Sequence, residues 1–105
     1  MAKTLSELGK KVLQVDCDLR KPTIHSLLGI NNLRGISNAL IDNQIKLDEI
    51  TQQVPGYENW SVITAGVTPP DPARIISSNR MKSIIKELDS SGKYDLIIYD
   101  TPPAT

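Results

Sequence analysis

Carboxylates and cations follow an apolar run near the start of this chain. The segment D-C-D-L-R-K-P, at residues 16–22, comes directly after K-V-L-Q-V. Side chains alternate along an extended chain, so Asp16 and Asp18 point to the same side. Their like charges repel, and a cation such as Mg²⁺, which prefers oxygen ligands, would relieve that repulsion. Arg20 and Lys21 add positive charge that suits phosphate oxygens.

A second apolar run delivers one carboxylate, Asp100, in L-I-I-Y-D-T-P-P at residues 96–103. In a Walker B motif, an aspartate in this position orients Mg²⁺. Structural alternatives remain open, because Asp also terminates strands and caps helices. Residues 16–18 could form a solvated turn, with Asp18 or Thr23 capping the next helix. The two segments together, each at the end of a predicted strand, favour a functional site.

Other reactive side chains favour packing over chemistry. Cys17 has no His or CxxC partner nearby in sequence, so we interpret it as a small packing residue. His25 lies within a short amphipathic stretch and is interpreted as a surface or packing residue. Tyr57, Tyr94 and Tyr99 are also interpreted as packing residues rather than phosphorylation sites, with Tyr57, in a loop, the most reachable.

Composition narrows the classes of function. The 105 residues are 39% hydrophobic and 23% charged, with 12 cationic and 12 anionic side chains, as expected of one ordinary globular domain. A single cysteine excludes an intrachain disulfide, and a single histidine excludes a multi-histidine metal site. Aromatic residues make up only 4%, so a base-stacking surface and a nucleic-acid partner are not expected.

Apolar periodicity predicts strands alternating with helices. Strands are expected at residues 11–15, 60–64 and 95–99, with Leu96–Ile98 suited to a strand buried on both faces. Helices are expected at residues 2–8, from Pro22-Thr23 to Gly29, at 36–41, and from 78 or 79 to 90; residues 51–59 and 66–71 are expected to be loops. In the first helix, Ala2, Leu5 and Leu8 are expected on one side. The inward-facing residues predicted from spacing in the other helices are Ile24, Leu27, Leu28, Ile36, Ala39, Leu40, Met81, Ile84, Ile85 and Leu88.

This alternation predicts an α/β layer fold with a mostly parallel sheet. In such sheets, ligands bind outside the carboxyl ends of the strands. Asp16, Asp18 and Asp100 are therefore expected at the edge where a ligand would bind.

The motifs resemble those of the bacterial protein-tyrosine kinases (BY-kinases) of capsule and exopolysaccharide synthesis. Residues 12–22 resemble their Walker A′ motif, an apolar strand followed by D-x-D-x-R, and residues 96–103 resemble their Walker B motif. The stretches G-I-N-N-L-R-G-I-S-N-A-L (29–40) and I-T-A-G-V-T-P-P-D-P-A-R-I-I-S-S (63–78) also fit. The resemblance covers nearly the whole chain.

The resemblance implies part of a three-layer P-loop NTPase fold, related to the MinD/ParA-type ATPases, that uses ATP and Mg²⁺. Asp16 and Asp18 match the catalytic Walker A′ carboxylates. Asp16 would hold Mg²⁺ and assist in activating the tyrosine hydroxyl, and Asp18 would support the metal site. Asp100 matches the Walker B carboxylate that orients the metal, so these three form the expected metal set. Arg20 and Lys21, with Asp100, are the expected nucleotide-binding residues.

The resemblance also implies partners and a location. Family members phosphorylate tyrosines of a C-terminal cluster, usually in trans within a ring-shaped oligomer. They work with a membrane-embedded activator segment of the polysaccharide co-polymerase type, at the cytoplasmic face of the plasma membrane. A tyrosine-containing protein is the implied substrate.

One family motif is missing from the sequence: the Walker A pattern G-x-x-x-x-G-K-[ST], which supplies phosphate-binding amides and a lysine. Gly9 and Gly92 precede lysine, but no hydroxyl residue follows. We therefore expect residues 1–105 to be the Walker A′ to Walker B part of a single larger catalytic domain, with Met1 not its natural start. These residues alone are expected to lack kinase activity. The alternatives are a MinD/ParA-type positioning ATPase and a non-catalytic interaction module.

Overall fold

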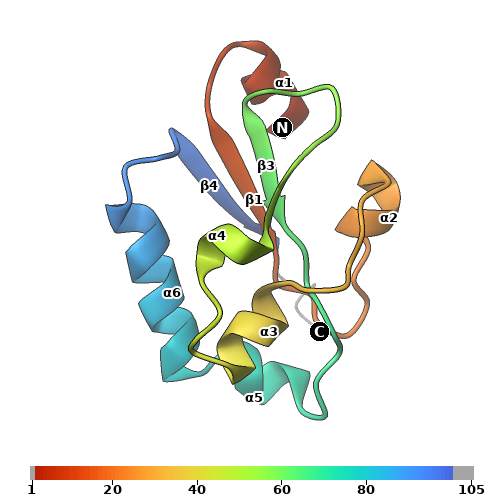
Figure 1. Ribbon diagram of the computed structural model, residues 1–105, viewed down its shortest axis with the longest axis vertical. Helices are drawn as coiled ribbons and strands as arrows, with labels where there is room; N and C mark the ends of the chain where they lie inside the picture. Colours follow the sequence, from red (N-terminus) through yellow and green to blue (C-terminus); the bar gives the residue numbers. More distant parts are fainter. Residues whose placement is uncertain (1, 101–105) are drawn as a thin grey trace.

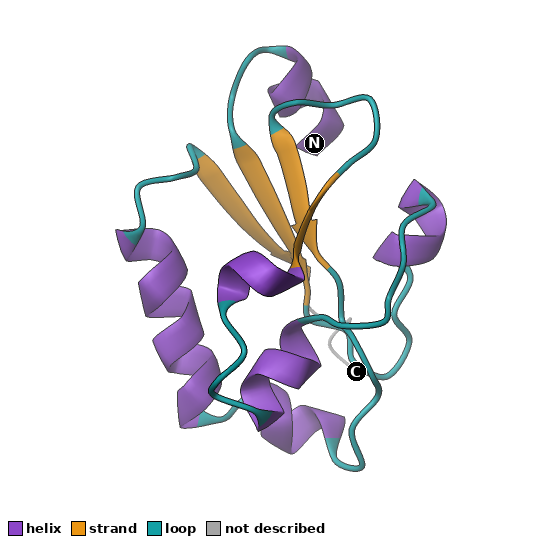
Figure 2. Cartoon of the chain, viewed as in Figure 1, coloured by secondary structure: helices purple, strands orange, loops and turns teal. Residues whose placement is uncertain are grey.

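The fold is built on a four-stranded sheet with helices against both faces (Figures 1 and 2). A computed structural model describes residues 2–100. The elements in chain order are α1 (Ala2–Glu7), β1 (Val12–Asp16), α2 (Ile24–Leu28), α3 (Ile36–Ile41), α4 (Leu47–Ile50), β2 (Thr51–Gln53), β3 (Trp60–Ile63), α5 (Pro72–Ile76), α6 (Asn79–Ser90) and β4 (Leu96–Asp100).

The sheet is mostly parallel, as predicted. Its strand order is β2-β3-β1-β4, and β1 runs parallel to both β3 and β4. The short β2 is antiparallel to β3. Register pairs Val12 with Trp60 on one side and with Leu96 on the other, and it pairs Asp16 with Asp100. The two predicted carboxylate segments therefore leave the sheet from neighbouring strands.

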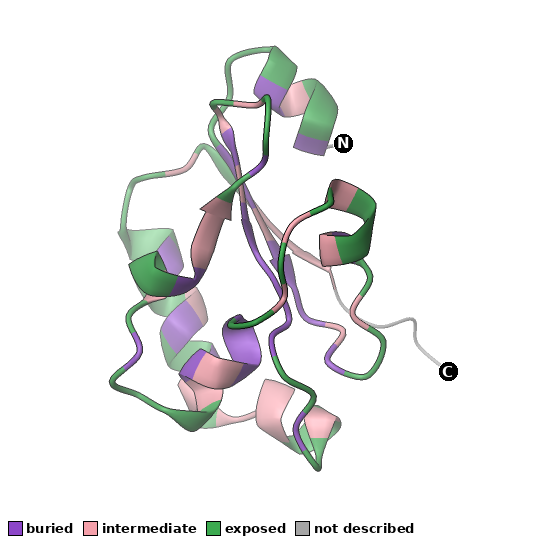
Figure 3. Ribbon diagram, turned by 45° about the vertical axis from the view of Figure 1, so that its right-hand side comes forward, coloured by how far each residue is buried: buried purple, intermediate pink, exposed green. Residues whose placement is uncertain are grey.

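One face of the sheet carries the larger apolar core. Leu13 and Val15 of β1 and Ile63 of β3 are fully buried there, and helices α3, α5 and α6 cover them. Figure 3 shows the buried residues concentrated along the central strands and on α3 and α6, whereas α5 contacts the core through the partly buried Ile75 and Ile76. We call this the closed face, and its buried cluster consists of Leu13, Val15, Cys17, Leu19, Ile36, Ala39, Ile45, Ile50, Ile63, Ala65, Met81, Ile84 and Leu88.

The other face carries a smaller cluster beneath α1 and α2, which lie across the sheet from α6 (Figure 1). Its buried members are Ala2, Val12, Ile24, Val54, Trp60 and Val62. Side chains alternate along β1, so Gln14 and Asp16 share this face with Val12. Asp100, the register partner of Asp16, projects to the same side. We call this the open face.

Capping residues set where the two helices before β4 begin. The Ser78 hydroxyl accepts the Met81 N–H at 3.3 Å and begins α6, whose residues Met81, Ile84 and Leu88 are buried as predicted. Asp71 accepts the Arg74 N–H at 3.4 Å and begins α5.

The structure departs from the sequence predictions in five details. Residues 51–53, expected in a loop, form β2, and neither α4 nor α5 was predicted, because three to five residues are too few to show a period. Leu27, expected inward, is 81% exposed, since α2 is too short for its whole stripe to reach the sheet. Among the described residues β4 is an edge strand with Leu96 37% exposed, not a strand buried on both faces.

No helix within residues 2–100 is long and apolar enough to cross a membrane.

Candidate functional site

Asp16 is the most deeply buried of the predicted site residues, with only 1% of its surface exposed. Its Oδ1 accepts the Asp18 N–H at 3.0 Å, but its Oδ2 is buried and accepts no hydrogen bond within the described part of the chain. Burial raises the pKa of this carboxyl above its usual range; the N–H groups of Asp18, Ile24 and Thr23 act in the opposite direction. A buried carboxylate oxygen without a donor has a coordination position open to a cation.

Asp100 lies beside Asp16 at the same edge of the sheet. The two residues are register partners, and the Asp100 carbonyl accepts the Cys17 N–H at 2.8 Å. The Asp100 Oδ2 accepts a hydrogen bond from Gln14 Nε2 at 2.7 Å. The structure therefore brings together the carboxylates of the two motifs, which lie 84 residues apart in the chain.

Asp18, Arg20 and Lys21 lie on the loop that follows β1. Asp18 is half-buried, and its Oδ1 accepts the Lys21 N–H at 3.2 Å. Arg20 and Lys21 are exposed. The structure does not join Asp18 to Asp16 and Asp100 in one cluster, since no three metal-ligating side chains within residues 2–100 are grouped to hold an ion. The functional roles of all five residues stay predictions.

Two of the three predicted carboxylates, Asp16 and Asp100, lie together in a way that fits a magnesium ion. Mg²⁺ is usually bound by one or two carboxylates together with waters and substrate phosphates. The unpartnered Asp16 Oδ2 and the neighbouring Asp100 carboxylate provide that number of ligand groups. Residues 101–103, the rest of the Walker B motif, lie outside the described residues.

The structure supports a packing role for Cys17 and Tyr99, both of which contact the closed-face core. Burial, aided by Asp16 and Asp100, raises the pKa of the Cys17 thiol to about 12. That thiol stays protonated near neutral pH and is a poor nucleophile. Burial also raises the pKa of Tyr99 to about 12.

Two motif-like stretches hold each other in place, a role that sequence reasoning missed. The Asn32 amide donates to the Gly66 carbonyl at 3.0 Å and accepts the Gly66 N–H at 2.8 Å. Ser37 donates its hydroxyl to the Val67 carbonyl at 2.6 Å. A Cβ on Gly35 would collide with the Thr64 carbonyl, so only glycine fits there. The segments N-N-L-R-G-I-S and T-A-G-V are part of the family resemblance in the sequence, but nothing in the sequence indicates that they contact each other.

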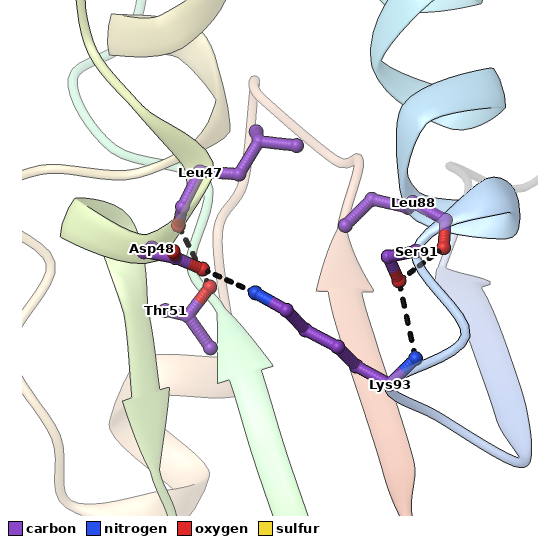
Figure 4. Close-up of polar contacts among 6 residues, drawn as sticks. All are labelled: Leu47, Asp48, Thr51, Leu88, Ser91 and Lys93. Carbon is purple, nitrogen blue, oxygen red and sulfur yellow. Dashed lines mark hydrogen bonds and ion pairs between the residues drawn. The ribbon is translucent and has the colours of Figure 1, made fainter.

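A separate cavity of about 380 Å³ lies between α4 and the end of α6. Lys93 and Asp48 both line it, and Figure 4 shows the Lys93 side chain extended to Asp48; the nitrogen–oxygen distance is 3.0 Å. None of the three predicted carboxylates lines this cavity. It is therefore distinct from the site at the carboxyl ends of β1 and β4.

Comparison with known proteins bears on this geometry. The family described as AAA domain matches residues 1–105. The chain is 37% identical over 103 residues to the tyrosine-protein kinase YwqD of Bacillus subtilis, covering 98% of this chain and 42% of YwqD. It thus spans less than half the length of that relative.

Solved structures agree with the sequence relatives. The kinase domain of the Escherichia coli tyrosine kinase ETK superposes with a TM-score of 0.86 at 33% identity, covering 97% of this chain and 38% of that one. MinD from Pyrococcus horikoshii, solved with Mg-ADP, superposes with a TM-score of 0.78 at 27% identity, covering 99% and 41%. The predicted fold class and family resemblance are therefore confirmed: the chain belongs to the AAA domain family, and its relatives there are bacterial tyrosine-protein kinases.

Proposed function

We propose that this chain is the Walker A′ to Walker B part of the catalytic domain of a bacterial protein-tyrosine kinase that uses ATP and Mg²⁺. The observation that carries the proposal is the pairing of Asp16 and Asp100 at the carboxyl ends of adjacent strands, with one buried Asp16 oxygen unpartnered. Ligands of parallel α/β sheets bind at this edge. The named kinase relatives support the same conclusion.

Each residue has a defined task in this proposal. Asp16 and Asp100 hold Mg²⁺, which supplies positive charge to the phosphates when bound. Asp16 also assists in activating the attacking tyrosine hydroxyl by accepting its proton. Asp18 supports this pair from the loop. Arg20 and Lys21 are exposed and free to contact phosphate oxygens.

The wider setting of the proposal rests on the family resemblance. The whole protein would phosphorylate tyrosines of a protein substrate, its own copies included, within a ring-shaped oligomer. It would act in capsule or exopolysaccharide synthesis and export with a membrane-bound activator of the co-polymerase type, at the inner face of the plasma membrane. A phosphate-binding loop outside these residues would complete the site.

The test is tyrosine phosphorylation by the full-length protein that contains this chain. Asp16→Ala and Asp100→Ala should each lower phosphotyrosine formation by about 100-fold or more, because general-base and metal-holding groups contribute on that scale. Asp89→Ala removes an exposed carboxylate of α6 and should leave the rate unchanged. Equal rates in all three variants would contradict the assignment.

A MinD-like ATPase is the second candidate, favoured by the superposition on MinD bound to Mg-ADP. Such a protein would hydrolyse ATP without forming phosphotyrosine, so measuring both products from one reaction separates the two functions. Residues 1–105 alone should show neither activity, because the sequence lacks the phosphate-binding motif. ATP turnover by these residues that is abolished in Asp16→Ala would contradict this expectation and favour a different nucleotide-binding mode.

A further inference from the structure

Gln14 is a polar residue in the middle of an otherwise apolar strand run. It occupies the centre of β1 and is half-buried on the open face, two positions before Asp16. Burying an amide in a sheet is costly unless its donor and acceptor are both satisfied. Both groups of this amide have partners, one on each neighbouring strand.

The amide connects a tryptophan to the Walker B carboxylate. The Trp60 indole N–H donates to Gln14 Oε1 at 3.3 Å, and Gln14 Nε2 donates to Asp100 Oδ2 at 2.7 Å. An indole N–H is only a donor, and an ionised carboxylate is only an acceptor. The amide therefore has a single favourable orientation, with its N–H₂ directed at Asp100.

Trp60 is itself fixed in position. The residue is 7% exposed, and its ring makes an edge-to-face contact with Tyr57 at a centroid distance of 5.1 Å and an interplanar angle of 73°. A continuous series of contacts thus connects the packed pair of Tyr57 and Trp60 to Asp100 through the Gln14 amide. A hydrogen bond of 2.7 Å to a charged acceptor is at the strong end of its class.

We propose that Gln14 is a positioning residue for the Walker B carboxylate. By holding Asp100 Oδ2, it fixes the rotamer of that side chain and leaves Oδ1 to the metal or its water shell. Its donor also offsets the repulsion between Asp16 and Asp100. This inference rests on the proposed nucleotide site, but Gln14 itself touches neither metal nor nucleotide.

The test compares Gln14→Leu with Gln53→Leu in the full-length protein. Leucine keeps much of the side-chain volume but has no donor. Gln53, on β2, is a matched control, since its Nε2 donates to the Tyr57 carbonyl at 3.0 Å, away from the carboxylates. The measurement is the affinity for fluorescently labelled ADP with Mg²⁺ and again with EDTA, and the readout is the ratio of the two.

Gln14→Leu should reduce the Mg²⁺-dependent gain in affinity by about 10–100-fold, the usual effect of removing a group that orients a metal ligand. Its affinity in EDTA should match wild type, whereas a merely structural glutamine would alter both values. The Trp60 indole N–H resonance, assigned from Trp60→Phe, should shift far more in Gln14→Leu, which removes its acceptor, than in Gln53→Leu, which affects Trp60 only through Tyr57.

The outcomes separate this inference from the function on which it rests. A wild-type protein whose ADP affinity is the same in Mg²⁺ and EDTA would overturn the nucleotide site and, with it, the role of Gln14. A wild-type protein with a normal Mg²⁺ effect, but with equal ratios in Gln14→Leu and Gln53→Leu, would overturn the positioning role alone.

Discussion

The closed and open faces of the sheet differ in what they bury. Beneath α3, α5 and α6, the closed face contacts an apolar cluster that includes Leu13, Val15 and Ile84, each fully buried. On the open face, beneath α1 and α2, the corresponding positions of β1 are Gln14 and Asp16. The same strand therefore has an entirely apolar side and a side on which the buried Val12 is followed by two polar residues, and only the alternation of side chains separates the two.

The closed face therefore contributes mainly to stability, and the open face provides the groups suited to chemistry. Burial of apolar surface is the dominant favourable term in folding, and the closed face supplies most of it. The open face keeps a buried carboxylate oxygen without a partner, a feature that lowers stability but suits a ligand site. We therefore expect that truncating Leu13 on the closed face lowers stability, whereas neutralising Asp16 on the open face raises it.

The largest expected effect is on the closed face. Leu13→Ala should lower the free energy of unfolding by about 2–5 kcal/mol, because it leaves a cavity in the centre of the cluster. Leu27→Ala is the matched control on the open-face helix α2, where the side chain is 81% exposed, and it should change stability by less than about 0.5 kcal/mol. Urea unfolding measures both, and equal losses would remove the distinction between the faces.

An intermediate effect is expected at the edge where the two motif-like stretches meet. Gly35→Ala should cost about 1–3 kcal/mol, because its Cβ would collide with the backbone at Thr64 and Gly66. The φ of Gly35 is −155°, which any residue adopts, so the loss would be steric rather than conformational. A urea midpoint equal to that of wild type would show that the backbone yields easily there.

A smaller effect, of opposite sign, is expected on the open face. Asp16→Asn should raise the free energy of unfolding at pH 7 by about 1 kcal/mol, because it removes a buried negative charge that lacks a full set of donors. The expected gain is at the low end for an unsatisfied buried group, since nearby solvent screens part of the cost of burying the charge. The folded pKa of Asp16 is raised, so its ionised form is penalised only above that pKa.

The gain from Asp16→Asn should therefore shrink as the pH falls through the folded pKa toward 3.8. Melting curves across this range measure it, with Asp89→Asn, at an exposed position, as a control that should show no such trend. A destabilised Asp16→Asn at neutral pH would mean that Asp16 is more favourably placed than its unpartnered oxygen indicates.

The smallest effect is expected at the exposed ion pair of Asp48 and Lys93, which belongs to neither buried cluster. Asp48 and Lys93 are 81% and 57% exposed, so Asp48→Asn should leave the melting temperature within experimental error (Figure 4). Melting in low and high salt measures it. A clear loss confined to low salt would show that this contact helps to hold α4 against the α6–β4 loop.

The sequence predicted the elements with repeated patterns and missed those without. The stripe of Met81, Ile84 and Leu88 identified α6, and apolar runs identified β1, β3 and β4. The strand β2 has three residues, T-Q-Q, and is extended because it pairs with β3, so no local pattern in the sequence predicts it. Contacts with other parts of the fold, rather than local sequence, determine such short elements.

The site was predicted in part for a similar reason. Two strand ends with carboxylates, together with the parallel-sheet rule, placed Asp16 and Asp100 at one edge. The sequence left two roles open for Asp18, at a metal site or in a local turn; the structure shows the turn contact, in which Asp18 Oδ1 accepts the Lys21 N–H, and its role at a metal site stays a prediction. The contact of Gln14 with Asp100 spans 86 residues, and only the register of the sheet brings them together.

The interlock of residues 32–38 with residues 64–67 determines where this chain can be recombined with a relative. The Asn32 side chain hydrogen-bonds both the N–H and the carbonyl of Gly66. The Gly35 backbone lies so close to the Thr64 carbonyl that a Cβ at residue 35 would collide with it. A chimera with its crossover between residues 41 and 59 would join halves whose interlocking segments come from different parents. Crossovers before residue 29 or after residue 78 would transfer the two segments together, and chimeras built that way should keep this interlock intact.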